Sequence, residues 1–411
     1  MKRFSAIRKN DLLLLISMGI TNIGGWVYHI ALNLILLDQT GSALAVTGLY
    51  LLKPFATLFT NPWAGSLIDR VNKRRLMILV NIAQALVMFI LPLLSSLWMI
   101  YALVFLINMG SSIFDPTSMT YMTKLVPKER RIRFNSLRSL VDSGAFVIGP
   151  AIAGVLFIIG TPTNAIYLNA GALFLAGLLF LLLPDVETEI RLNQSGMISF
   201  QMMKEDWRIV YTFSRSAIFI ILIYFLVSAV GIMSWGVDSL EASFATEVLH
   251  LTNTEYGFLV SIAGIGVLLG AILNTVIAEK GEPLSLIGGG AIVLSIGYLI
   301  FALSSSFQLA AIGCFVLSFS LSFMNTGFYT FYQNNIPVDV MGRIGSLFEW
   351  IEAIFVIAVM VGCGIAAELI SIRFSVIVGS SVMLSFAFLL LGVVMVKRTS
   401  MRSEAEHRLA K

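Results

Sequence analysis

The sequence predicts an all-α membrane protein in which twelve transmembrane helices form two pseudo-symmetric six-helix bundles, and three observations support this class. First, 58% of the 411 residues are hydrophobic and 12% are charged, with a mean hydropathy of +0.91; a soluble domain is nearer half apolar and a quarter charged. Second, twelve apolar stretches have about the 20 residues that cross a bilayer core. Third, the two halves of the chain carry similar segments at matching places.

The apolar stretches are each predicted to form one helix. The first follows Lys2 and Arg3; it is too long for a cleavable signal sequence and lacks a small-residue cleavage site, which predicts a retained helix. Lys and Arg gather in the connections after the second, fourth and sixth stretches. The positive-inside rule therefore places both termini in the cytoplasm, and the localisation that we expect is a bacterial cell membrane. The approximate bounds of the stretches are 12–37, 43–63, 76–94, 97–123, 135–159, 163–183, 216–239, 254–278, 284–303, 306–334, 344–369 and 372–396.

One connection is much longer than the rest and divides the chain. It is polar and charged, and "MISFQMMKEDWRIVYTF" within it has the pattern of an amphipathic helix on the cytoplasmic membrane surface. A solvated linker helix is the simpler alternative. The predicted organisation is an N-terminal six-helix bundle, a linker, a C-terminal six-helix bundle and a cytoplasmic tail. Their bounds are 1–183, 184–215, 216–397 and 398–411.

The third observation is an internal repeat. The segment "VPKERRIRFNSLRSLVD" (126–142) aligns without gaps on "IPVDVMGRIGSLFEWIE" (336–352). Both segments lead into the fifth helix of their half, so duplication explains the match better than chance. Two parallel six-helix repeats around a site at mid-membrane are a transporter architecture. The matched pairs include Pro127 with Pro337, Arg133 with Arg343, and Asp142 with Glu352.

The stretch "GSLIDRVNKRR" (65–75) concentrates charge just after the second apolar stretch. It resembles the loop 2–3 signature of the major facilitator superfamily, Gly-x-x-x-Asp-Arg-x-Gly-Arg-Arg, with Asn72 in place of the second glycine. Because Asn tolerates the left-handed conformation, the turn is expected to survive. The matching positions are Gly65, Asp69, Arg70, Lys73 and Arg74.

The fifth apolar stretch carries "GAFVIGPAIAG", which is similar to the exporter motif Gly-Pro-x-x-Gly-Gly at Gly149, Pro150 and Gly154. The stretches "FDPTSMTYMTKLVP" and "NSLRSLVDSGAFVIGP" resemble the macrolide- and drug-efflux branch of drug:proton antiporters. The resemblance implies the superfamily fold and proton-coupled export of amphipathic organic compounds, such as a drug, a macrolide or a siderophore. Many of these antiporters carry an arginine where this chain has Asn108, so an arginine-assisted proton relay is not expected here.

The same charged stretch predicts a conformational latch. Gly65 allows close helix packing, and Asp69 can accept hydrogen bonds from a helix N-terminus or from an arginine. Asp69 and Arg70 would tie the two halves together in one conformation and release them in the other, with Glu349 as the expected partner. The basic residues, Lys73 and Arg74 among them, would lie against the anionic leaflet. Topological anchoring alone is the alternative.

Polar and aromatic residues form stripes on the first, fourth, seventh and tenth helices. The resemblance implies that these four helices line a central cavity. Within each stripe the spacing of three and four residues corresponds to one helical face, and lipid disfavours such groups. Helix–helix hydrogen bonding is the alternative, but four stripes on the four expected helices favour a cavity suited to an amphipathic organic molecule. The predicted cavity residues are Asn22, Trp26, His29, Asn33, Asn108, Ser112, Tyr224, Ser228, Trp235, Asn325, Tyr329 and Tyr332.

Ionisable residues inside the predicted helices are functional candidates, because charge is costly in a bilayer. Asp115 is favoured as a proton- or cation-binding carboxylate, since it has no partner within its own helix and precedes a proline; Glu352 is second. A buried structural acid is the alternative. Two structural ion pairs are expected, Arg138 with Asp142 four residues on, and Lys53 with Glu352. The proton-coupling candidates together are Asp115, Glu352, Asp142, Glu349 and His29.

Other classes find no support in the sequence. It contains no nucleotide-binding, Gly-x-Ser-x-Gly or His-Glu-x-x-His motif, only three His, and two Cys that lie in apolar runs. We therefore expect neither an enzyme nor a metal site. We expect no cofactor, and a proton gradient as the energy source. The expected partners are a small amphipathic substrate, protons and membrane lipids, without nucleic acid and with the protein as a monomer. Lipid flipping and nutrient uptake are the alternatives within the transporter class.

Overall fold

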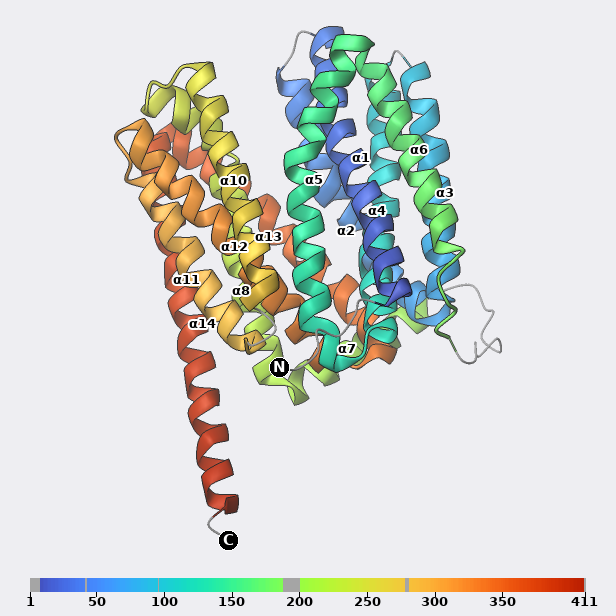
Figure 1. Cartoon of the computed structure of the whole chain (residues 1–411), viewed down its shortest axis with the longest axis vertical. Helices are drawn as coiled ribbons and strands as arrows, with labels where there is room; N and C mark the ends of the chain where they lie inside the picture. The colour runs from blue at the N-terminus through green and yellow to red at the C-terminus, as the bar shows by residue number, and fades with distance from the viewer. Residues whose placement is uncertain (1–7, 41–42, 95, 188–199, 278–280, 410–411) are drawn as a thin grey trace. The chain divides into compact units, whose positions relative to one another are not determined.

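The computed structural model describes residues 8–40, 43–94, 96–187, 200–277 and 281–409. Lys2, Arg3 and the first part of the predicted amphipathic segment lie outside these ranges. The regular elements of the described residues are all helices, as the sequence predicts (Figure 1).

Each predicted span is occupied by a helix. In the first half of the chain these are α1 (Lys9–Thr40), α2 (Ala43–Arg70), α3 (Lys73–Ile90), α4 (Leu97–Leu125), α5 (Arg131–Ile159) and α6 (Pro162–Phe180). The predicted linker contains α7 (Phe200–Ser216). In the second half they are α8 (Ile218–Asp238), α10 (Asn253–Ile277), α11 (Pro283–Ala302), α12 (Phe307–Asn335), α13 (Met341–Leu369) and α14 (Ile372–Leu409). Short helical turns are η1 (Leu91–Leu93), η2 (Lys128–Arg130), α9 (Glu241–Ser243), η4 (Phe244–Val248) and η6 (Val338–Val340).

Within the described residues, eleven helices are long and apolar enough to cross a membrane. They make the chain a multi-pass membrane protein. The helix α2, which covers the second predicted span, is not among the eleven. It carries Lys53 and two prolines, Pro54 and Pro62.

The helices form two compact units that do not coincide with the two halves of the sequence. Each unit takes in the beginning of the fifth helix of the other half, α13 in unit 1 and α5 in unit 2. Residues 135–142 in unit 2 and 336–352 in unit 1 belong to the segments that align in the internal repeat. Unit 1 is Met1–Phe134, Gly144–Phe213 and Ile336–Ile354; unit 2 is Asn135–Ser143, Ser214–Asn335 and Phe355–Lys411.

The helix packing of unit 1 is repeated in unit 2. In unit 1, α1 packs against α6, α2 against α4, and α3 against both α4 and α6 (Figure 1). In unit 2, α8 packs against α14, α10 against α12, and α11 against both α12 and α14. Helix for helix, these are the same neighbours counted from the start of each half. Two copies of one six-helix repeat predict this agreement.

Close backbone approach holds these helices together. Lipid tails are as apolar as Leu side chains, so helix association in a membrane depends on packing and hydrogen bonds more than on hydrophobic transfer. In unit 2, a Cβ at Gly297 of α11 would lie 2.4 Å from the backbone N of Leu317, and one at Gly290 would lie 2.7 Å from the backbone N of Met324. These two glycines allow α11 and α12 to touch along their backbones.

The aligned segments of the repeat also begin alike. Pro127 precedes η2, which leads directly into α5, and Pro337 precedes η6, which leads directly into α13. Both prolines have extended backbone, with ψ of 149° and 133°. Proline suits this place because its missing N–H is not needed before the first helical turn.

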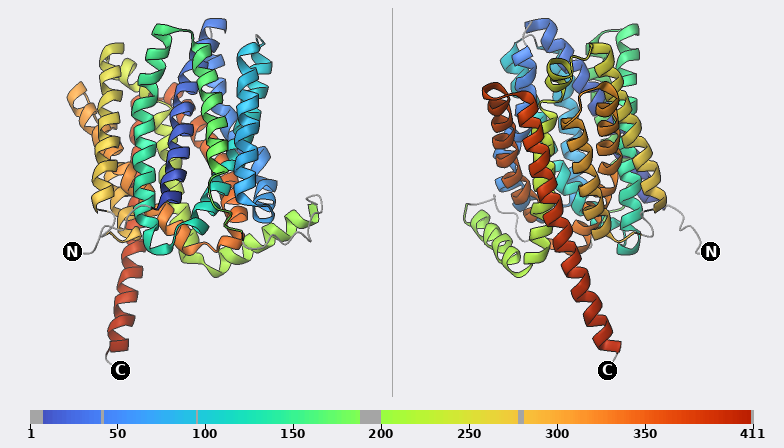
Figure 2. Two further views of the ribbon diagram at one scale, coloured as in Figure 1. Left: turned by 45° about the vertical axis from the view of Figure 1, so that its right-hand side comes forward. Right: turned by 90° about the vertical axis from the view of Figure 1, so that its left-hand side faces the viewer.

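One expectation about local structure is wrong. Asn72 does not adopt the left-handed conformation; its φ is −66° and its ψ is 115°. It is the N-cap of α3, and its Oδ1 accepts the backbone N–H of Arg75 at 3.0 Å. An N-cap requires extended backbone and a side-chain acceptor, so Asn serves this turn for a different reason from the glycine of the signature. At the other end of the chain, α14 continues as a helix through the predicted tail to Leu409 (Figure 2).

Candidate functional site

The charged stretch 65–75 lies where α2 ends and α3 begins, an end of unit 1 that we call the latch end. Gly65 faces the beginning of α13. A Cβ at Gly65 would lie 2.6 Å from the Cα of Arg343 and 2.9 Å from the carbonyl oxygen of Gly342. Cβ atoms do not approach backbone so closely, so only glycine lets α2 pack on the backbone of α13 here.

The carboxylate of Asp69 caps the N-terminus of α13. Its Oδ1 accepts the backbone N–H of Gly342 at 3.0 Å, and its Oδ2 accepts the backbone N–H and the Nε–H of Arg343 at 3.2 and 2.7 Å. The side chain is 1% exposed. The expected partner of Asp69, Glu349, is therefore wrong. A carboxylate needs donors, which the helix N-terminus and Arg343 supply, whereas Glu349 lies six residues further along α13, about 9 Å of helix.

A second carboxylate, Asp206 of α7, completes the latch. It accepts hydrogen bonds from Arg70 Nη1 and Nη2 at 2.7 and 3.0 Å and from Arg343 Nη1 at 2.8 Å. The hydroxyl of Ser66 donates to it as well. Burial acts to raise the pKa of Asp206, but the hydrogen bonds from Arg70 and Ser66 and the charge of Arg343 hold that pKa below its ordinary value. The latch thus balances two arginines with two carboxylates.

The remaining basic residues of the stretch face α6 and the beginning of the linker. Lys73 Nζ lies 3.2 Å from Oε1 of Glu187. The Arg74 guanidinium donates to the carbonyls of Phe180, at 3.1 Å, and Leu181. The last carbonyls of a helix lack partners and form its negative end, so a cation is favoured there. Lys73 is 3% exposed, and the expectation that it lies against lipid headgroups is therefore wrong.

Three of the proton-coupling candidates belong to unit 1. They are Glu349 and Glu352 of α13 and Asp115 of α4. Glu349 Oε2 accepts a hydrogen bond from Asn61 Nδ2 at 3.0 Å. The charges of Asp115, Glu352 and Lys53 all act on Glu349. Three carboxylates and one ammonium, carried by α2, α4 and α13, thus interact, and we call these four residues the acid cluster. The pairing of Lys53 with Glu352 stays a prediction.

Proline chemistry explains how α13 is held beside the acid cluster. Pro62 has no N–H, so the carbonyl of Leu58, four residues earlier in α2, loses its helical partner. The indole N–H of Trp350 on α13 donates to that carbonyl at 3.1 Å. The hydroxyls of Thr57 and Ser112 lie 3.0 Å apart and join α2 to α4. These two contacts fix the three helices that carry the acids.

The other two proton-coupling candidates are Asp142 and His29. Asp142 belongs to unit 2, where its Oδ2 lies 3.8 Å from Nε of Arg138, the predicted pair. The Arg138 guanidinium also stacks 4.4 Å from the centre of the Tyr329 ring. His29 is exposed on α1, with its ring centre 5.2 Å from that of Tyr28. The charge of Lys53, a member of the acid cluster, also acts on His29.

The predicted cavity residues of the first half differ in their surroundings. Trp26 is 38% exposed and meets the Phe146 ring edge-on at 4.9 Å. The Asn108 side chain donates to the Val104 carbonyl of its own helix at 3.0 Å. Ser112 is buried against α2. The other two, Asn22 and Asn33, are half-buried.

The predicted cavity residues of the second half include a packed aromatic cluster. Tyr224 of α8 and Tyr332 of α12 are buried, with ring centres 6.0 Å apart. Trp235 is 58% exposed, and Tyr329 lies beneath Arg138. For the tyrosine pair, contact between helices is what the structure supports; lining of a cavity by the whole set stays a prediction. The remaining two, Ser228 and Asn325, are half-buried.

The glycines of the exporter-like motif have different environments. A Cβ at Gly149 would lie 2.4 Å from the Cβ of Trp26, so this glycine allows α5 to approach α1. A Cβ at Gly154 would meet nothing within 4 Å. Pro150 lies inside α5. Close packing therefore accounts for Gly149 but not for Gly154.

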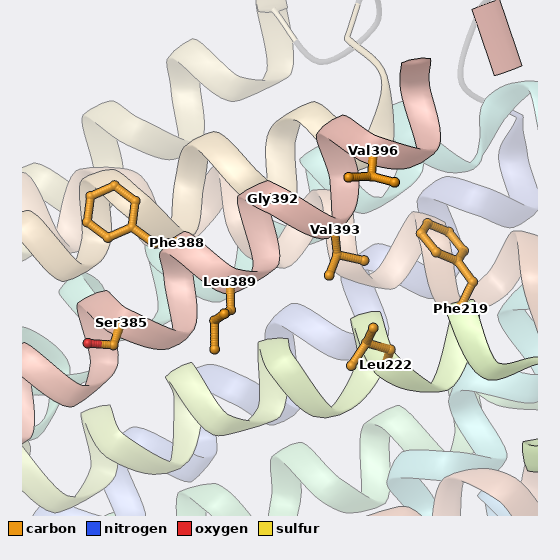
Figure 3. Close-up of a pocket in the computed structure, with 8 residues that line it drawn as sticks. All are labelled: Phe219, Leu222, Ser385, Phe388, Leu389, Gly392, Val393 and Val396. Atoms are coloured by element: carbon orange, nitrogen blue, oxygen red, sulfur yellow. The ribbon is translucent and has the colours of Figure 1, made fainter. Parts of the chain in front are cut away.

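A pocket of about 980 Å³ lies between α8 and α14 of unit 2 (Figure 3). Its lining is apolar apart from Ser385, and Phe388 and Leu389 are 58% and 59% exposed. None of the predicted cavity residues lines it. An apolar groove on the surface of spanning helices suits lipid chains better than a polar substrate. The lining residues are Phe219, Leu222, Ser385, Phe388, Leu389, Gly392, Val393 and Val396.

The repeated packing and the latch can be compared with known families. A family model described as Major Facilitator Superfamily matches residues 14–360. The chain belongs to this superfamily. Major facilitator proteins are transporters and not enzymes, and they bind small-molecule substrates.

Several curated major facilitator proteins are similar to this one. The uncharacterized MFS-type transporter YfiS of Bacillus subtilis is 24% identical over 380 residues, which cover 90% of each chain. Macrolide efflux protein A of Streptococcus pyogenes is 21% identical over 332 residues, 78% of this chain and 80% of the relative. Multidrug resistance protein MdtH of Salmonella typhimurium is 28% identical over 185 residues, 44% of this chain and 46% of the relative.

Solved structures show the same fold. A bacterial homologue of the iron transporter ferroportin, in an outward-facing state, matches with a TM-score of 0.74 at 18% identity, covering 95% of this chain and all of the other. The human organic anion transporter MFSD10 matches with a TM-score of 0.77 at 12% identity, covering 93% and 98%. At such identities the likeness establishes the fold and not the cargo. Within the described residues of this major facilitator protein, no group of three or more His, Cys, Asp or Glu is placed to hold a metal ion.

We expect Asp69→Asn to slow transport without preventing folding. Asn keeps the shape of the side chain but loses the charge that binds Arg343 and the α13 N-terminus. A hydrogen bond to a charged group contributes about 1.5–3 kcal/mol, which corresponds to roughly a 10- to 150-fold change in the latch equilibrium. The initial transport rate, measured in vesicles beside the expression level and the thermal unfolding midpoint, tests this. A wild-type rate from a normally expressed variant would remove the latch role.

Proposed function

We propose that the protein exports amphipathic organic compounds, such as a drug, a macrolide or a siderophore, in exchange for protons by alternating access. The acid cluster carries the proposal. The charges of Asp115, Glu352 and Lys53 all act on Glu349, on helices where charge is costly. An entering proton would neutralise one of these carboxylates.

Coupling between the proton and the latch would pass through α13. The helix begins at the latch with Arg343 and carries Glu349 six residues later. A proton on Glu349 changes the charge beside Asn61 and Lys53, and a small shift of α13 there would draw its N-terminus away from Asp69. One charge crossing 100 mV supplies about 2.3 kcal/mol, which is comparable to the contribution of one charge-assisted hydrogen bond.

Export is favoured over uptake by two observations. The motif around Gly149 and Pro150 is similar to that of exporters, and macrolide efflux protein A aligns over 80% of its own length. We place the protein in a bacterial cytoplasmic membrane as a monomer without a cofactor. The latch end and both termini would face the cytoplasm, because the positive-inside rule favours that side for the connections rich in Lys and Arg. The second candidate function is lipid flipping, which the apolar groove between α8 and α14 favours.

The substrate would bind among the predicted cavity residues that remain accessible. In unit 1, Trp26 presents exposed aromatic surface and Asn33 is a half-buried amide. Aromatic surface with a few polar groups suits an amphipathic molecule. The latch residues would govern access, while the acid cluster would set the direction.

The test is transport by energised inverted membrane vesicles across a panel of macrolides, dyes and siderophores, with and without an uncoupler. In such vesicles the cytoplasmic side faces outward, so an exporter loads the compound into the lumen. We expect at least one compound to accumulate, to be lost on adding the uncoupler, and to be absent from vesicles that lack the protein. If no compound moves in an uncoupler-sensitive way, uptake or flipping replaces export, and a fluorescent phospholipid added to the panel separates these two.

A further inference from the structure

The linker helix α7 lies across the latch end of unit 1 (Figure 2) and binds it through one face. Asp206 and Val210 are buried and Met203 is half-buried, whereas residues 204, 205 and 207–209 are exposed. The spacing of three and four residues defines a single helical face. A carboxylate on a buried face is costly unless its hydrogen bonds are satisfied. In α7 they are satisfied by residues of α2 and α13.

Asp206 connects the two cations of the latch. Arg70 on α2 donates to both of its oxygens and also to the carbonyl of Ser66 at 2.8 Å. Arg343 on α13 donates to Asp206 through Nη1 and to Asp69 through Nε. Without the charge of Asp206, two guanidinium groups would lie beside the single carboxylate of Asp69. Their repulsion in a poorly solvated site would oppose the contact between α2 and α13.

An aromatic contact holds α7 to the same two helices. The indole N–H of Trp207 donates to the carbonyl of Pro62 on α2 at 3.3 Å. The Trp207 ring lies 6.4 Å, centre to centre, from that of Trp350 on α13. The linker helix is thus bound to α2 and to α13 at adjacent points. The two helices cannot separate here unless α7 releases at least one of them.

We propose that Asp206 is the positioning residue of the latch, holding Arg70 and Arg343 so that Asp69 engages α13, and that α7 must leave this site before the latch opens. The linker helix then takes part in the opening and closing of the latch and is not a passive connection. The inference depends on alternating access, which the proposed function includes, but not on its substrate, its direction or its coupling to protons.

The test compares Asp206→Asn with Glu205→Gln, which removes one negative charge from the exposed face of the same helix. The reporter is Ser346→Cys on α13, at a side chain that is 1% exposed, labelled with a hydrophilic maleimide. Labelling of Cys314 and Cys363 is measured in the protein without the reporter and subtracted. We expect labelling in Asp206→Asn to be about tenfold faster or more, the effect of losing one charge-assisted hydrogen bond. Glu205→Gln should label like the wild type.

A second variant separates the proposal from a folding defect. Arg70→Met removes the other side of the contact and leaves the Asp69–Arg343 pair in place, so it should also accelerate labelling, without further acceleration when combined with Asp206→Asn. The thermal unfolding midpoint of each variant is measured on the same sample. Wild-type labelling in well-folded Asp206→Asn or Arg70→Met overturns the proposal, and so does equal acceleration by Glu205→Gln. Labelling uses neither substrate nor proton gradient, so a failure of proton-coupled export in vesicles would leave this result standing.

Discussion

Glu349→Gln is expected to abolish proton-driven accumulation of the substrate while leaving its downhill movement intact. Glutamine has nearly the same shape, and its oxygen can still accept the hydrogen bond that Asn61 gives to Glu349 at 3.0 Å. It cannot bind and release a proton. If one proton is coupled to each cycle, 100 mV supplies about 2.3 kcal/mol, so the variant should lose a concentration ratio of about 50-fold.

Two measurements on the same vesicles separate coupling from transport. Accumulation against an imposed proton gradient should fall to equilibrium with the outside, whereas exchange of labelled for unlabelled substrate without a gradient should continue at a rate near that of the wild type. A defect in folding or in substrate binding would lower both. A proton site lowers only the first.

The control for this variant is Glu368→Gln, at an exposed position near the other end of α13. It makes the same chemical change on the same helix, away from the acid cluster, and should accumulate substrate normally. Full accumulation by Glu349→Gln would exclude Glu349 as the proton carrier. The same pair of measurements on Asp115→Asn and Glu352→Gln would then decide whether another member of the acid cluster carries the proton.

The spanning helices were predictable because a bilayer imposes one strong requirement on each of them, a long apolar run with its backbone hydrogen bonds satisfied internally. The ends of the helices were less predictable. The prediction stopped α2 at residue 63 and α14 at residue 396, where the apolar runs end, whereas the helices continue to Arg70 and Leu409. The length of an apolar run corresponds to the thickness of the lipid and not to the length of the helix. Nothing in the two polar extensions breaks a helix, so both helices continue beyond their apolar runs.

The latch was only half predictable. The signature located Asp69, and the repeat placed Arg343 opposite Arg133. The partner predicted for Asp69 and Arg70 was Glu349, whose carboxylate cannot donate a hydrogen bond to Asp69. Asp206 was missed, although a signal was present. Asp206 lies three residues after Met203 and four before Val210, which places this acid on the apolar face of α7.

The stripes of polar residues show a different limit. A stripe fixes which face of a helix avoids lipid, but a neighbouring helix and a cavity serve that purpose equally well. Tyr224 and Tyr332 fulfil the pattern by packing on each other. The contact of Asp206 with Arg343, 137 residues apart, depends on how whole helices pack. No local pattern in one sequence encodes it.

Gly65→Ala is expected to open the latch, although it adds a single methyl group. The new Cβ would lie 2.6 Å from the Cα of Arg343 and 2.9 Å from the Gly342 carbonyl oxygen, and backbone atoms cannot turn aside as a side chain can. The helix α13 must move back, which lengthens the 3.0 Å hydrogen bond from Gly342 N–H to Asp69. Overpacking of this kind costs about 1–3 kcal/mol, or roughly a 5- to 150-fold shift away from the latched state.

The matched control for Gly65→Ala is Gly289→Ala on α11, where an added Cβ meets nothing within 4 Å. Helix propensity favours Ala over Gly by about 1 kcal/mol in both, so any difference between the two variants comes from the contact with α13. We expect Gly65→Ala to slow transport and to expose the Ser346→Cys reporter to maleimide, with Gly289→Ala behaving as the wild type. If Gly65→Ala transports and labels normally, then α2 and α13 are not pressed together at this glycine in the working protein, and the latch must depend on its charges alone.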